Sequence, residues 1–212
     1  MGARTTALSA LIACRKQGAW ADGTLKEYIR RDALDRRDAA LATRLCYGVL
    51  QNRMLLDHYI QCCLTGPLKK LQPIVLDILR LGAYQLLLMD RIPSSAAVNE
   101  AVEQGKKYAN QRAAGLINAI LRSMIRKRDE LPAPKSLAVR HSHPETSVRL
   151  LENNIPPSTL EALLESHNAS VDTVVHVNTL CASDSDVADD LRQNGIEVTA
   201  HPWMPHALCL SG

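Results

Sequence analysis

The 212-residue sequence predicts a mainly α-helical protein, with an all-α helical bundle followed by a small, incomplete α+β domain. Apolar residues recur at spacings of three and four through most of residues 1–130, as in amphipathic helices. These residues carry 21 Lys plus Arg against 12 Asp plus Glu, a net charge of +9, whereas residues 131–212 carry 4 against 10, a net charge of −6. The Pro-rich segment LPAPK separates the two parts. We therefore expect a helical domain at 1–130, a linker at 131–136 and an α+β domain at 137–212.

The helical domain is expected to hold six or seven helices joined by short loops. Apolar stripes mark the first four helices: Leu8, Leu11 and Ile12; Leu25, Tyr28 and Ile29; Leu41, Leu45 and Val49; Leu55, Tyr59 and Ile60. Pro73 suits the first turn of a long helix that runs to Met89, because its missing N–H would have no partner there. That helix is apolar nearly all round, so we expect it to be the most buried. Ser94 or Ser95 is expected to cap the next helix.

The α+β domain is expected to alternate short helices and strands. Pro144 and Pro157 begin two short helices, and TVVHVNT then alternates like a half-buried strand. Ser183 is the expected N-cap of a further helix that ends at Gly195. IEVT follows as a second strand, and LCLSG begins another.

Two amides lie at the edges of apolar helical stripes. Asn99 is within a turn of Val98 and Val102, and Asn118 adjoins the stripe of the helix over residues 111–128. A buried amide is costly unless it is hydrogen-bonded. We interpret both as structural residues that bond buried partners between helices, and contact with a ligand is the alternative.

Basic residues recur on the expected outer faces of the helical domain. They are candidate contacts to RNA phosphates, and the alternative is an ordinary solvated surface. The candidates are Arg36, Arg37, Lys106, Lys107, Arg112, Arg122, Arg126 and Arg128. The chain has only seven aromatic residues and no Phe, which favours phosphate and shape contacts with structured RNA over base stacking.

Several other classes of protein are not expected. The apolar runs are shorter than the roughly 18 to 20 residues that span a bilayer. The N-terminus has no cleavage signal, so we expect a cytoplasmic protein. The six cysteines lack C-x-x-C spacing and are expected to be free thiols. His141 and His143 alone are too few for a metal site, and we expect both to be structural.

The segment ILRLGAYQLLLMDRIPSSAAVNEAVEQGKKY, followed by GLINAILR, resembles the helical domain of the antitermination factor NusB. More closely, it resembles the version at the amino terminus of bacterial 16S rRNA cytosine-C5 methyltransferases of the Sun/RsmB family. This resemblance covers residues 4–128. HSHPE at 141–145 and HVNTL at 176–180 are similar to the small domain that precedes the catalytic domain in that family. The resemblance implies binding to structured ribosomal RNA and S-adenosylmethionine as cofactor of the full-length enzyme.

The sequence departs from this family at several positions. Thr146 stands where Trp usually follows HPE, and His176 and Cys181 replace the usual Arg and Lys beside VNTL. These changes weaken RNA contacts assigned to the α+β domain. There is no Gly-rich strand-to-helix loop for S-adenosylmethionine and no Pro-Cys or Thr-Cys pair to supply a nucleophile. We therefore expect no catalytic, cofactor-binding or metal-ligating residue in this sequence, with the methyltransferase domain absent.

The leading interpretation is the RNA-binding N-terminal part of an S-adenosylmethionine-dependent 16S rRNA cytosine-C5 methyltransferase. Its expected partners are structured ribosomal RNA and the missing methyltransferase domain, with no membrane and no DNA. A stand-alone, NusB-like antitermination or regulatory module is the alternative, and the α+β domain argues against it. A structural protein whose basic surface meets an acidic partner is a third interpretation.

Overall fold

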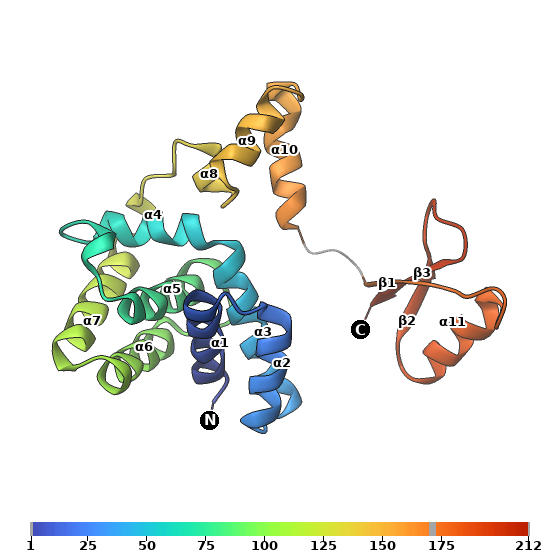
Figure 1. Cartoon of the computed structure of the whole chain (residues 1–212), viewed down its shortest axis with the longest axis horizontal. Helices are drawn as coiled ribbons and strands as arrows, with labels where there is room; N and C mark the ends of the chain where they lie inside the picture. Colours follow the sequence, from blue (N-terminus) through green and yellow to red (C-terminus); the bar gives the residue numbers. More distant parts are fainter. Residues whose placement is uncertain (1, 170–172, 212) are drawn as a thin grey trace. The chain divides into compact units, whose positions relative to one another are not determined.

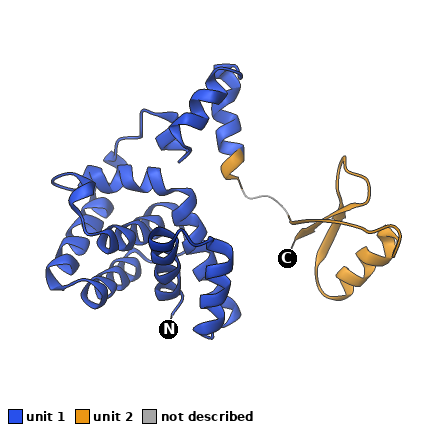
Figure 2. Cartoon of the chain, viewed as in Figure 1, with its two compact units in different colours: residues 1–166 blue, residues 167–212 orange. Residues whose placement is uncertain are grey.

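The computed structural model describes residues 2–169 and 173–211, which form two compact units (Figure 2). The first unit spans residues 1–166 and the second spans residues 167–212. Within the first unit, a large apolar core covers the first seven helices, and a separate small cluster lies among the helices that follow the Pro-rich segment. The second unit has its own apolar cluster. The domain limits expected from the sequence stay a prediction.

The first unit is built of helices. Its elements are α1 (Ala3–Gln17), α2 (Ala21–Arg31), α3 (Arg36–Gln51), α4 (Arg53–Cys63), the 3-10 turn η1 (Leu68–Lys70), α5 (Pro73–Leu88), α6 (Ser94–Tyr108), α7 (Gln111–Arg126), the 3-10 turn η2 (Arg128–Glu130), α8 (Leu137–Arg140), α9 (Glu145–Glu152) and α10 (Pro157–Asn168). No strand occurs in residues 2–130, so the prediction of an all-α first part is confirmed. None of the helices in the described ranges is long and apolar enough to cross a membrane.

The second unit is a small α+β fold (Figure 1). It contains β1 (Thr173–His176), α11 (Asp184–Gln193), β2 (Glu197–Ala200) and β3 (Ala207–Ser211). β3 lies in the middle of the sheet and is antiparallel to both neighbours, so Cys209 pairs with Val174 on one side and Thr199 on the other. The strand expected to begin at LCLSG is thus the central one.

Local sequence signals place several helix ends correctly. Pro73 lies in the first turn of α5, and Ser183 caps α11 in a capping box with Asp186, each side chain bonding the other residue's backbone N–H. The cap expected at Ser94 or Ser95 is wrong. Pro93, in an extended conformation, precedes α6, so Ser94 is already helical and no side chain caps this end.

α5 is the central helix of the bundle, as its composition predicted. It packs on α1, α3, α4, α6 and α7 (Figure 1), and its residues from Asp77 to Leu86 are all buried. Surrounding one helix on so many sides requires it to be apolar nearly all round. α5 nevertheless also buries charged and polar side chains, and its composition alone does not predict which partners these side chains contact.

The buried charges of α5 form an ion-pair network with α1 and α4. Arg80 Nε and Nη2 donate to the two carboxylate oxygens of Asp57, at 2.7 and 2.8 Å. Arg80 Nη1 lies 3.4 Å from Asp77, and Arg15 Nε donates to the other Asp77 oxygen at 2.7 Å. Burial raises the pKa of Asp77, and the neighbouring Arg15 and Arg80 oppose that rise. The network therefore depends on both arginines to keep a buried carboxylate charged.

The packing of α3 on α5 depends on Gly48. A Cβ atom added there would overlap the ring of Tyr84, which is itself buried. Although Ala is the better helix former, Gly48→Ala is expected to reduce the free energy of unfolding by about 1 to 3 kcal/mol, because the ring has to move within a packed core. Urea denaturation measures this, with Gly115→Ala as a control, since no atom lies near a Cβ there. A gain in the free energy of unfolding for both variants would contradict the close packing of Gly48 against Tyr84.

Candidate nucleic-acid interface

The eight basic residues selected from the sequence lie on three separate parts of the helical bundle, and all are exposed. Arg36 and Arg37 begin α3. Lys106 and Lys107 lie in the last turn of α6, and Arg112 lies in the first turn of α7. The remaining three, Arg122, Arg126 and Arg128, lie at or just beyond the end of α7. The eight candidate residues are thus divided into three groups.

The most concentrated group surrounds the turn between α6 and α7. Two residues, 109 and 110, connect these helices, which pack against each other. Lys106, Lys107 and Arg112 are therefore neighbours at one end of the helix pair, and we call them the turn cluster. Lys106 Nζ bonds Glu103 at 2.6 Å, and Lys107 Nζ lies 5.2 Å from the centre of the Tyr108 ring. Arg112 has no ion pair within the described residues.

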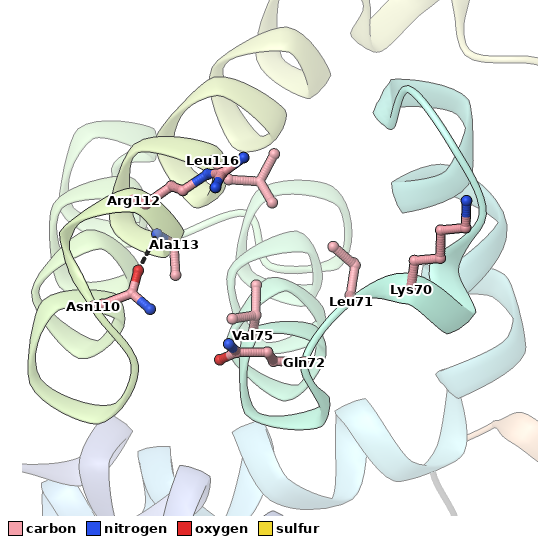
Figure 3. A pocket seen from close by; sticks show the side chains of 8 residues that line it. All are labelled: Lys70, Leu71, Gln72, Val75, Asn110, Arg112, Ala113 and Leu116. Carbon is pink, nitrogen blue, oxygen red and sulfur yellow. Dashed lines mark hydrogen bonds between the residues drawn. The ribbon is translucent and has the colours of Figure 1, made fainter.

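Arg112 also lines a pocket of 460 Å³ between α7 and the segment that leads into α5. Figure 3 shows Lys70 on one side of this pocket and Arg112 on the other, with Leu71 and Val75 between them. Asn110 caps α7 beside them, its Oδ1 accepting from the backbone N–H of Ala113 at 2.9 Å.

The pocket therefore combines two cations with an apolar floor near the positive end of the α7 dipole. Such a surface attracts phosphate groups. Lys70 is not among the eight candidates selected from the sequence. The adjacent Lys69 and Lys70, just before Pro73, indicate a basic surface in the sequence. Only the packing of α5 on α7, however, places Lys70 across from Arg112.

The other two groups have acidic neighbours, as Lys106 has in Glu103. Arg36 and Arg37 lie between Asp35 and Asp38, and Asp35 Oδ1 accepts from the backbone N–H of Asp38 at 2.7 Å. Arg128 is followed directly by Asp129 and Glu130. α3 packs mainly on α1, α2 and α5, whereas α7 packs on α4, α5 and α6, so the start of α3 belongs to another part of the bundle. The turn cluster is the strongest candidate because Arg112 lines a pocket opposite Lys70.

The structural role expected for the two amides is not what the structure shows. Asn99 is exposed, and Asn118 is half-buried. Asn118 Oδ1 accepts from Arg122 Nε at 2.9 Å, one turn along the same helix. Neither amide is therefore the buried link between helices that the sequence suggested. Asn118 instead holds the guanidinium of a basic residue on the outer face of α7.

Asn118→Ala is accordingly expected to change the free energy of unfolding by less than about 0.5 kcal/mol, because the bond it removes is at the surface. Urea denaturation of the variant beside the wild type provides the measurement. A loss greater than about 1 kcal/mol would show that the amide supports the core after all.

Comparisons with known proteins agree on both parts of the chain. Residues 1–126 match the NusB family, and residues 143–212 match the RsmF/B-like methyltransferase ferredoxin-like domain. A probable ribosomal RNA small subunit methyltransferase B of Bacillus subtilis is 32% identical over 200 residues, covering 92% of this chain and 44% of that protein. Ribosomal RNA small subunit methyltransferase B of Vibrio cholerae is 35% identical over 176 residues, covering 82% and 40%. The chain thus spans less than half the length of these relatives.

Solved structures show the same fold. The crystal structure of PH0851 matches 98% of this chain and 48% of its own, with a TM-score of 0.66 and 18% identity. A structure of the antitermination factors NusB and NusE in complex with dsRNA matches 59% of this chain and 94% of its own, with a TM-score of 0.55 and 22% identity. At these identities the likeness concerns the fold alone.

Proposed function

The chain belongs to the NusB family, and we propose on this premise that its helical domain binds structured ribosomal RNA by contacts to phosphates. The turn cluster carries the proposal, because Lys106, Lys107 and Arg112 gather at one end of the α6–α7 pair with Lys70 across the adjoining pocket. Cations that are exposed and close together attract phosphates more strongly than the same charges dispersed over a surface.

The second group at the end of α7 extends this surface along one helix. Arg126 lies fourteen positions after Arg112, a length of about 21 Å at the helical rise of 1.5 Å per residue. Arg122 is held between them by its bond to Asn118. We propose that α7 follows a run of phosphates, with the turn cluster as the main contact and Arg122, Arg126 and Arg128 as secondary ones. Arg36 and Arg37 would contribute attraction at longer range.

We further propose that the chain is the RNA-holding part of an rRNA small subunit methyltransferase of the Sun/RsmB type, acting in the cytoplasm. The similarity to the two methyltransferases extends over both units and supports this over a stand-alone antitermination module, whose match ends with the helical part. Methyl transfer to cytosine C5 from S-adenosylmethionine would be carried out by residues outside this sequence. The connection from β1 to α11, residues 177–183, does not fit that cofactor, because it contains no glycine for close approach of the backbone.

Fluorescence anisotropy with the full chain tests the proposal. The probes are a structured 16S rRNA fragment, an unstructured RNA of equal length and a DNA duplex of equal length. The structured rRNA is expected to bind most tightly, since phosphate and shape contacts favour an A-form helix. Equal affinity for the DNA duplex would mean that the basic surface recognises charge alone. No binding to any of the three at low salt would reject RNA binding altogether.

A further inference from the structure

One cluster of metal-ligating side chains lies outside the basic surface, within the helices that follow the Pro-rich segment. His141 directly follows α8, and Glu161 and Glu165 lie four residues apart on α10, so both carboxylates are on one face of that helix. One potential ligand atom from each of the three residues lies within 4.8 Å of the other two. His141 is buried, whereas Glu161 is partly exposed and Glu165 is exposed, so the cluster is open to solvent on one side.

The spacing within the cluster suits a shared cation. His141 Nε2 lies 3.5 Å from Glu161 Oε1, which is longer than the 2.7 to 2.9 Å typical of a charge-assisted hydrogen bond. Two ligands of a tetrahedral zinc ion, each about 2.1 Å from the metal, are roughly 3.4 Å apart. An imidazole combined with carboxylates is a donor set that transition metals accept, whereas Mg²⁺ and Ca²⁺ prefer oxygen ligands alone.

His143, although close to His141 in the sequence, does not belong to this cluster. The His143 ring is turned to the backbone, where its Nδ1 donates to the carbonyl oxygen of His141 at 2.8 Å. The acidic partners of His141 come instead from α10, about 20 residues further along the chain. No short sequence motif connects them, and the packing of α8 beside α10 brings them together.

The surrounding segment would gain from a metal. Its apolar cluster contains four buried residues, Ala138, Val148, Leu160 and Leu164, with three partly buried ones against it. A core of that size contributes little stability, and small folds are commonly held by a metal or a disulfide. Arg140 of α8 already makes an ion pair with Glu161 of α10, which helps to hold the two helices together. Arg140 also competes with any cation for that carboxylate.

We propose that His141, Glu161 and Glu165 bind a divalent transition metal of the Zn²⁺ class, which fastens α8 to α10. Its three protein ligands leave the fourth position, on the exposed side of the cluster, to water. Nothing in this proposal depends on RNA binding by the helical bundle.

Calorimetric titration of the full, chelator-treated chain with Zn²⁺ tests the proposal, with Mg²⁺ as the contrasting cation. Glu165→Gln is the informative variant, because Glu165 is exposed and has no described part in the Arg140 ion pair. It is expected to weaken the binding of one Zn²⁺ by about tenfold or more while leaving the melting temperature of the metal-free chain unchanged. Glu152→Gln removes another exposed carboxylate of the same segment and is expected to bind Zn²⁺ as the wild type does.

Two further measurements separate this site from the free cysteines. The absorption spectrum of the Co²⁺-loaded chain is expected to lack thiolate charge-transfer bands, because the ligands are nitrogen and oxygen. Arg140→Gln is expected to tighten Zn²⁺ binding several-fold by removing the competing cation. Unchanged Zn²⁺ affinity in Glu165→Gln would overturn the proposal. So would a Co²⁺ spectrum of that variant in which thiolate bands are the only signal, because the metal would then be bound by cysteines.

Discussion

Arg80→Leu is expected to lose about 3 to 5 kcal/mol of the free energy of unfolding, because removing one member of a buried ion network leaves its partners without compensation. The guanidinium of Arg80 makes both bonds to Asp57 and lies beside Asp77. Leucine fills much of the space but satisfies neither carboxylate. Equilibrium denaturation in urea at neutral pH measures the loss. Arg15→Leu is the comparison and is expected to cost less, since the Arg15 side chain is 29% exposed and that of Arg80 only 8%.

The loss in Arg80→Leu should depend on pH. Burial already raises the folded-state pKa of Asp77, and removing a neighbouring cation raises that pKa further. A carboxyl group whose folded pKa is raised favours folding while it is protonated, and this contribution is lost as pH rises through the folded pKa. The deficit of the variant is therefore expected to shrink as the pH falls from neutral toward the ordinary pKa of Asp. A deficit that is the same at both ends of this range would show that Asp77 is not the destabilised partner.

Reversing the charge of the turn cluster, with Lys106→Glu, Lys107→Glu and Arg112→Glu combined, is expected to weaken binding to structured rRNA on the order of 100-fold at low salt. The reason is the loss of three phosphate contacts together with new repulsion from the carboxylates. Fluorescence anisotropy measures the affinity. All three side chains are exposed, so the melting temperature is expected to remain close to that of the wild type.

A matched control has the same change in net charge elsewhere on the bundle. Lys16→Glu, Lys26→Glu and Arg30→Glu replace three exposed cations of α1 and α2, outside the proposed interface. This variant is expected to lose less than about fivefold in affinity, because only long-range attraction is reduced. Equal losses of affinity in the two variants would mean that RNA binding depends on the total charge of the chain and not on the turn cluster.

Much of the fold could be predicted from the sequence because its signals are local. Pro73 and Ser183 mark helix starts through their own backbone and side-chain chemistry, and the apolar composition of α5 reflects its central place. The ion network could not be predicted in this way. Arg80 and Asp77 lie in an apolar run, and their partners Asp57 and Arg15 are 23 and 62 positions away.

The basic residues show the same division between local and tertiary information. Composition and short runs identified Lys106, Lys107 and Arg112, but only packing shows that Lys70 faces Arg112 across a pocket and that the start of α3 lies apart. The prediction that Asn118 bonds buried partners between helices is wrong, because whether the edge of an apolar stripe is buried depends on which helix packs over it. In this bundle, Asn118 stays partly exposed and turns to Arg122.

The proposed contact of the turn cluster with phosphates is tested most directly by the salt dependence of rRNA binding. The logarithm of the binding constant falls with the logarithm of salt concentration by roughly 0.7 to 0.9 for each phosphate contact. We expect a steep slope for the wild type. Combined charge reversal at Lys106, Lys107 and Arg112 is expected to make the slope shallower by about 2 to 3, while the control on α1 and α2 keeps the wild-type slope. Identical slopes for wild type and turn-cluster variant, or wild-type binding that is insensitive to salt, would contradict the claim.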